Sequence, residues 1–241
     1  MEGLVRGSVQ KCLFLGAIGD IKIPVPSLEE QEKIIHILSS LDKKIEINNK
    51  INKTLEEMVQ STFTRWFIDF EFPNENGNPY KSSGGEMIES EIGMIPKGWK
   101  ENCIYNLAEY INGTSFKSKD YIEFGLPIIK IAELKNGITE STKFFGGKKD
   151  QKFYIKNRDI LFSWSGNPET SIDTFIWYKG EAILNQHIFK VIPKNDDEYS
   201  FIYLLLKSLK ETFINIARNK QTTGLGHVTV KDLKSLKIAV S

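Results

Sequence analysis

The most regular pattern of apolar and polar positions in the chain runs from Ser27 to about Phe70 and predicts one long α-helix. Apolar positions recur at alternating spacings of four and three residues, as in a helix that packs lengthwise against another helix. Residues 27–72 contain neither Gly nor Pro, and a helix of that length is about 70 Å long. The positions of this seam are Ile34, Leu38, Leu41, Ile45, Asn48, Asn52, Leu55 and Val59.

The start of this helix carries a local signal. Ser27 and Glu30 form an S-x-x-E capping box, and the two prolines of "IPVP" keep the preceding residues extended. Asn48 and Asn52 interrupt the apolar seam, which fixes the register of a paired helix at some cost in stability. No second helix of similar length is evident in the sequence. We therefore expect the partner helix to come from another chain or a second copy; the alternative is a bundle within this chain.

After the helix the pattern changes twice. Residues 73–98 are rich in Asn, Gly, Ser and Pro and are expected to form a connector. Short β-like runs follow, and residues from about 95 to 241 are expected to form a mixed α+β domain. The expected elements are strands at 126–134 and 158–166, a hairpin-like pair of strands around Lys179 and Gly180, an amphipathic helix at 198–218, and then a Gly/Thr loop, a short helix or turn and an extended end.

A weak internal repeat links the two ends of the sequence. The segment "IGDIKIPVPS" near the start aligns with the closing "LKSLKIAVS", so that Ile21-Lys22-Ile23 matches Leu236-Lys237-Ile238. The repeat suggests that residues 1–26 are the closing segment of a domain.

Composition adds little, but the local distribution of charge adds more. The chain has 241 residues, and its 32 basic against 31 acidic side chains do not point to a partner. No run reaches the ~18 apolar residues needed to span a bilayer, and Cys12 and Cys103 form no motif, so a cytoplasmic protein is expected. Residues 143–158 carry six bases, and residues 200–241 carry seven. Such clusters indicate either a polyanion-binding surface or an ordinary solvated one.

Signals for catalysis are weak. Asn78-Pro79-Tyr80 is similar to the motif of amino-methyltransferases, but it lacks the second proline and lies in the polar connector. His36, His187 and His227 have no spacing typical of a metal site, and the glycine pairs are not followed by a phosphate-binding lysine. The sequence therefore predicts no catalytic residue, no metal and no cofactor.

Several phrases in a fixed order carry a family resemblance. They are "IPVPSLEEQEKI" before the long helix, "GLPIIKIAELKNG", "RDILFSWSG", "NQHIFKV" and the Gly/Thr loop before "LKIAVS". Together they resemble the specificity (S) subunit of type I restriction–modification systems. The resemblance implies an α+β fold, with one long conserved spacer helix and a mixed α/β-containing DNA target-recognition domain. It also implies double-stranded DNA and methyltransferase (M) subunits as partners, with the restriction (R) subunit contacted indirectly and catalysis left to those partners.

The chain departs from the family pattern in having one helix and one recognition domain, where the family has two of each. The expected parts are a remnant of a first domain at 1–26, the spacer helix at 27–72, a linker at 73–94 and a target-recognition domain at 95–241. Three explanations for this departure stay open. The chain is a fragment of a recombining specificity gene, a half-subunit that dimerises, or a shortened sequence. A DNA-modifying enzyme and a structural coiled-coil adaptor are the alternatives from other functional classes.

Three loops contain the side chains expected to contact DNA, because amides bond base edges and cations bond phosphates. Each also has an ordinary structural explanation: a polar loop at a helix end, a turn or a solvated surface. The predicted contacts are Arg218, Asn219, Lys220, Gln221, Thr222, Thr223 and His227 in and after one loop, Asn167 and Glu169 in the second, and Lys117 with Lys130 in the third.

Overall fold

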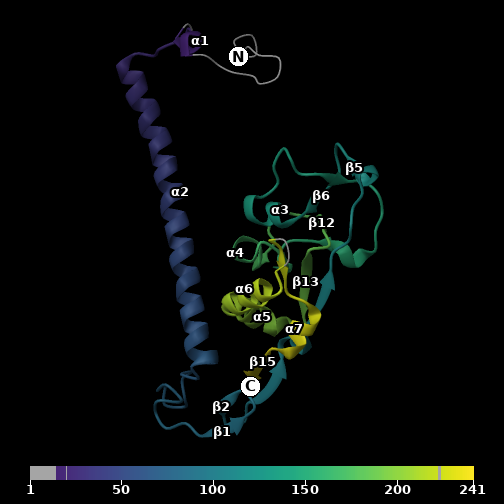
Figure 1. The fold of residues 1–241 in the computed structure, drawn as a ribbon. Coiled ribbons are helices and arrows are strands. Elements are labelled where there is room, and N and C mark those ends of the chain that lie inside the picture. The colour runs from purple at the N-terminus through teal and green to yellow at the C-terminus, as the bar shows by residue number, and fades with distance from the viewer. Residues whose placement is uncertain (1–14, 20, 222–223) are drawn as a thin grey trace. The chain divides into compact units, whose positions relative to one another are not determined.

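The computed structural model describes residues 15–19, 21–221 and 224–241, and the chain divides into two compact units, residues 1–55 and 56–241 (Figure 1). The first unit contains the short helix α1 (Leu15–Gly19) and most of the long helix α2 (Leu28–Phe63). Most of the proposed remnant at 1–26, including Cys12, lies outside the described residues, as do Thr222 and Thr223.

The predicted long helix is confirmed. α2 has 36 residues, and the π-helical turn η2 (Thr64–Ile68) extends it. The capping box forms as expected, because the Ser27 backbone N–H donates to Glu30 Oε2 at 2.9 Å and the Glu30 N–H donates to Ser27 Oγ at 3.4 Å. These bonds satisfy donors that a helix N-terminus otherwise leaves unpaired.

The apolar seam of α2 faces solvent. The six hydrophobic seam positions named above are between 47% and 59% exposed. Phe63 is the only buried residue in α2, all of which the structure describes. Salt bridges one turn apart, Lys33 to Glu29 at 2.6 Å and Lys50 to Glu46 at 2.7 Å, support the helix along its surface.

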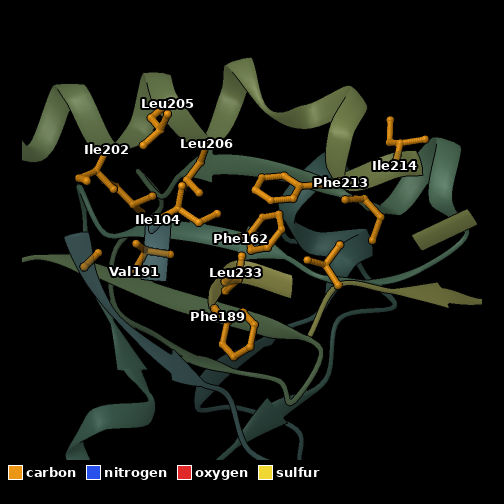
Figure 2. Close-up of a cluster of buried hydrophobic side chains, with 14 of the residues drawn as sticks. Ile104, Phe162, Phe189, Val191, Ile202, Leu205, Leu206, Phe213, Ile214 and Leu233 are labelled. Carbon is orange, nitrogen blue, oxygen red and sulfur yellow. The ribbon is translucent and has the colours of Figure 1, made fainter. Parts of the chain in front are cut away.

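The main core of the second unit lies between a four-stranded antiparallel sheet and three helices. Figure 2 shows Ile202, Leu205 and Leu206 pointing toward Ile104 and Phe162, all of them buried. The sheet has the order β11-β9-β13-β4, with β4 (Ala108–Asn112), β9 (Ile160–Ser163), β11 (Asp173–Ile176) and β13 (Ile188–Pro193), and the helices are α5 (Tyr199–Ser208), α6 (Lys210–Asn219) and α7 (Val230–Ser235).

A second, five-stranded sheet has the order β5-β7-β6-β12-β8, in which β12 is parallel to β6. Its strands are β5 (Tyr121–Ile122), β6 (Leu126–Ile129), β7 (Phe144–Phe145), β8 (Tyr154–Ile155) and β12 (Ala182–Leu184), and α3 (Ile131–Asn136) follows β6. Smaller antiparallel ladders join β1 (Met87–Ser90) to β2 (Gly93–Pro96), β3 (Lys100–Cys103) to β15 (Lys237–Val240), and β10 (Ser165–Gly166) to β14 (Gly226–His227); α4 (Pro168–Ser171) follows β10.

Three local predictions need correction. The hairpin around Lys179 and Gly180 is wrong, since β11 and β12 belong to different sheets and the intervening Trp177 is buried. The helix predicted at 198–218 is two helices, α5 and α6, which meet at Leu209. The strand predicted at 126–134 ends at Ile129 and gives way to α3.

The connector is folded rather than extended. Phe72 stacks between Tyr80, at 4.6 Å between ring centroids, and Trp99, at 5.3 Å. The Asn74 carboxamide oxygen accepts from the backbone N–H groups of Asn76 and Asn78, both at 3.0 Å. In Asn78-Pro79-Tyr80, the tyrosine hydroxyl donates to the Glu86 carbonyl at 2.9 Å, so this segment serves the turn.

Phe63 joins the last turns of α2 to the core of the second unit. Its side chain is 3% exposed, and its ring lies 4.9 Å from that of Phe67 and 5.5 Å from that of Phe201 in α5. Phe67 in turn contacts Trp99 at 6.0 Å. Aromatic pairs at such distances add to the stabilisation that burial of their surface provides.

Phe63→Ala is therefore expected to lower the free energy of unfolding of the second unit by about 3 kcal/mol, through lost burial and a residual cavity. Met58→Ala, which truncates a 60% exposed side chain of the same helix, is the control and is expected to change it by less than about 0.5 kcal/mol. Urea denaturation of the full chain measures both. Equal effects of the two substitutions would contradict this role of Phe63.

Candidate nucleic-acid interface

The structure brings two of the three predicted loops together. β10 pairs with β14, so that Ser165 lies opposite His227 and Gly166 opposite Gly226. The Val228 N–H donates to the Trp164 carbonyl at 2.8 Å and extends this ladder. We call the surface formed by residues 165–171, 218–221 and 224–227 the ladder surface.

An ion pair closes the same surface. The Arg218 guanidinium, near the C-terminal end of α6, donates through Nε to Glu169 Oε1 at 3.2 Å, and its Nη2 also contacts this oxygen. Its Nη1 donates to Asn215 Oδ1 at 2.9 Å. Figure 1 shows α4 beside α6 in the second unit. Both residues are exposed, so the pair can open toward a ligand at modest energetic cost.

Two predicted contact residues have structural partners. Asn167 is the N-cap of α4, and its Oδ1 accepts from the N–H groups of Glu169 at 3.1 Å and Thr170 at 3.2 Å. Lys220 Nζ lies 2.5 Å and 2.6 Å from the two carboxylate oxygens of Asp232. These two side chains fix the loops, whereas Asn219 and Gln221 are exposed.

Asp232 holds the end of the loop in two ways. Its Oδ2 accepts from the N–H of Thr229 at 2.7 Å and from the Thr229 hydroxyl at 2.6 Å, which caps α7. Burial by itself raises the pKa of the Asp232 carboxyl, but hydrogen bonds from Lys220 and Thr229 outweigh it and hold that pKa below its usual value. The folded loop therefore favours the charged form of the Asp232 carboxylate.

A cavity of about 310 Å³ lies next to the ladder surface. Lys130, from the third predicted loop, reaches it, and the Lys130 amine lies 5.7 Å from the centre of the Tyr121 ring. The cavity is mostly apolar with a few converging polar groups, a composition typical of ligand pockets. It is lined by Lys130, Ile131, Ala132, Ser165, Gly166, Asn185, His187 and Leu225.

Asn185, Gln186 and His187 were not predicted as contact residues. They form the turn between β12 and β13, where Gln186 is exposed and its Nε2 lies 3.1 Å from His187 Nε2. The His187 ring lies 5.6 Å from the Trp164 ring. Three polar residues that interrupt the apolar run "AILNQHIFKV" are the signal that could have identified this turn.

Lys117 lies apart from the ladder surface. It precedes the 3₁₀ turn η4 (Ser118–Asp120), its backbone N–H donates to Asp120 Oδ2 at 2.7 Å, and its side chain is exposed. Among the described residues, no group of three or more His, Cys, Asp or Glu could hold a metal ion. No helix in the described part of the chain is long and apolar enough to cross a membrane.

Comparison with known protein families shows the family to which the chain belongs. The model of the "Type I restriction modification DNA specificity domain" matches residues 1–57 and 96–240, most of the sequence. The chain belongs to this specificity family. The predicted membership is thereby confirmed, and the family is a non-catalytic one, as the sequence indicated.

Individual members of the specificity family are distant in sequence. The chain is 28% identical to the type I restriction enzyme MjaIX specificity subunit of Methanocaldococcus jannaschii, over all of this chain and 55% of that protein. It is 24% identical to the HindI specificity subunit of Haemophilus influenzae, over 79% of this chain and 53% of that protein. The chain thus spans about half the length of these relatives.

The fold agrees with a solved member of the specificity family. The crystal structure of the type I restriction–modification system S subunit from M. genitalium matches with a TM-score of 0.54 at 15% identity, covering 99% of this chain and 57% of that one. The predicted α+β class, with one long helix and mixed sheets, is confirmed.

The Lys220–Asp232 pair gives a testable property of the ladder surface. Lys220→Met is expected to lower the free energy of unfolding at pH 7 by about 1 kcal/mol, because Asp232 loses its cation. Since the folded pKa of Asp232 is depressed, this contribution is complete above the unfolded value of about 3.9 and is lost as pH falls through the folded pKa.

Urea denaturation at pH 7 and at about pH 3 measures the difference between Lys220→Met and the unaltered chain. The control is Lys231→Met, which changes an exposed lysine next to Asp232 in sequence. A difference that persists unchanged at the lower pH would show that the ion pair is not its source.

Proposed function

We infer that this chain is a sequence-specific DNA-recognition subunit of a type I restriction–modification complex, which recognises one half of a bipartite site. The observation that carries the proposal is the ladder surface: two loops rich in amides and cations are held on one backbone ladder beside a cavity. Membership of a DNA specificity family supports the same proposal. We propose that the recognition domain comprises residues 95–241, and the second matched segment, residues 96–240, supports this proposal.

The side chains divide into two proposed roles. Asn219, Gln221 and Gln186 carry exposed amides, which can bond adenine edges in the major groove. Lys130 and His227 lie at the cavity and on the ladder, where they can contact phosphates. The two loops are held in place by Arg218, Lys220, Asn167 and Glu169. Lys117 lies apart from them and is proposed to contact the phosphate backbone of the DNA.

The exposed seam of α2 is the proposed site of assembly. Apolar residues on a heptad repeat are stable in water when a second helix covers them. We assign the seam to a second spacer helix, from another chain or a second copy, and propose that methyltransferase subunits dock on the assembled protein. The restriction subunit joins through them. The names of the relatives, which are specificity subunits of restriction enzymes, support this arrangement.

Gln221→Ala is expected to change the preferred half-site, because it removes an exposed amide that can bond a base in two places. Selection of bound duplexes from a random pool, by the complex with its methyltransferase subunits, measures the preference. Asn76→Ala removes an exposed amide from the connector and is the matched control, expected to leave the preference unaltered. An unchanged preference in Gln221→Ala would remove this residue from the recognition set.

Leu41→Asp combined with Ile45→Asp is expected to abolish helix pairing, because two charges would be placed in an apolar seam. Both side chains are more than half exposed, so the chain itself should remain folded. Ile47→Asp, at an exposed position off the seam, is the control. Sedimentation measures the mass of the chain alone and of the complex. Identical masses for the unaltered chain, the double variant and Ile47→Asp would count against pairing through the seam.

A further inference from the structure

Phe124 is an apolar side chain in an unusual setting. It lies in the loop between β5 and β6 and is 82% exposed, the highest value among the large hydrophobic side chains described in the second unit. Tyr121, three residues earlier, faces the Lys130 amine, and that lysine also lines the cavity beside the ladder surface. The loop of Phe124 is thus connected, through Tyr121 and Lys130, to the cavity beside the ladder surface.

The loop that carries Phe124 is firmly held. β5 and β6 both pair with the two residues of β7, so the loop passes over one end of that strand. A Cβ at Gly125 would come within 2.6 Å of the Phe145 carbonyl oxygen, which shows how closely the backbone approaches β7. Below it, Phe145 is buried with Ile128 and Ile183 in a cluster of its own. The exposed ring is thus presented by a packed element.

The chain segment that contains Phe124 and the segment that pairs with it carry a surplus of lysine, although Glu123 directly precedes Phe124. The two segments that pack together here, residues 115–130 and 143–153, carry seven lysines against three acidic residues, a net charge of +4, whereas the whole chain has a net charge of +1. The Lys149 amine lies 3.5 Å from the Ser115 carbonyl and 5.6 Å from the centre of the Phe116 ring, which joins the two segments. We call this region, with Phe124 at its tip, the cationic lobe.

Composition separates two kinds of occupant for the cationic lobe. The centres of protein–protein interfaces are depleted in lysine and are more apolar than the rest of the protein surface. A surplus of lysine around a few exposed apolar side chains, here Phe124 and the 43% exposed Ile122, is instead the arrangement of proteins that enter the DNA minor groove, where cations bind phosphates and an apolar wedge separates two base pairs. The charge of the lobe thus favours a duplex.

We propose that Phe124 is a wedge that inserts between stacked base pairs and bends the DNA, while lysines of the cationic lobe hold the flanking phosphates. This inference rests on the proposed function and adds a contact that recognises deformability rather than base edges. Pyrimidine–purine steps unstack most easily, so the site is expected to contain such a step under the wedge. The bend brings more of the duplex against the protein, which offsets the loss of stacking.

The test uses the complex of the full chain with its methyltransferase subunits and a duplex selected by that complex. 2-Aminopurine at successive adenine positions reports unstacking by increased fluorescence, and dyes at the two ends report bending. Phe124→Ala is expected to lose both signals and about tenfold in affinity, with an unchanged salt dependence because no phosphate contact is removed. Phe124→Leu, which keeps an apolar wedge, is expected to retain the bend.

Tyr178→Ala, which truncates another highly exposed aromatic side chain, is the matched control and should change neither signal. A complex that selects and binds a duplex without raising fluorescence at any position would overturn the wedge and leave the proposed function standing. A complex that selects no duplex would overturn both. If Phe124→Ala loses methyltransferase subunits but the variant complexes that remain still bend the duplex, Phe124 is a protein contact and the wedge is overturned.

Discussion

The long helix both packs against its own domain and leaves an apolar seam exposed, and this division depends on the packing of Phe63 in the second unit. Phe63 and Phe67 are one turn apart and face the same core, where they meet Phe201 and Trp99. The heptad positions Thr62 and Trp66 come one residue earlier and are exposed. One helix therefore presents two neighbouring faces, an aromatic face buried against its own domain and an exposed apolar seam. A shift of either the aromatic spacing or the heptad spacing by one residue would place both sets of side chains on the same face of the helix.

The end of the helix is fixed by its backbone geometry and by further aromatic contacts. The π-helical turn over residues 64–68 is followed by Phe70, which has the left-handed φ of 61° and ends the helical path. The Phe70 ring packs edge-on against Trp99, at 5.6 Å between centroids. The connector then folds back through the stack of Phe72 on Tyr80. The junction is thus stabilised by packed aromatic surface.

The sequence predicted features that depend on neighbours in the chain and failed where distant residues decide. The capping box of Ser27 and the exposed seam of α2 follow from local spacing alone. The supposed hairpin at Lys179 failed because burial of Trp177, whose N–H and carbonyl bond to the backbone of Asp159 and Arg158, separates β11 from β12. The two-residue ladder between β10 and β14 joins segments about sixty residues apart. No local sequence pattern predicts a strand pairing of only two residues.

Counting charges in the sequence likewise overestimated the cations available to a ligand. Lys207 and Lys210 both bond Asp173, at 2.9 Å and 2.8 Å, and although burial raises the pKa of that carboxyl, the two lysines hold it below its usual value. Arg218 and Lys220 are also ion-paired. The basic residues of the C-terminal segment are therefore largely used inside the domain. The surplus that remains lies in the cationic lobe, which the sequence marked only as a run of lysines.

The roles that we propose for these residues would allow the domain to change its specificity without losing its fold. The backbone ladder and the buried ends of α6 and α7 hold the loops, while Asn219 and Gln221 contribute nothing to the core. Substitutions at those exposed positions alter the groups offered to bases at little cost in stability, as expected for surface positions. Substitutions at Asn167 or Asp232 instead remove a helix cap, so they are constrained by folding. The proposed recognition residues and the residues that stabilise the fold are thus different residues of the same loops.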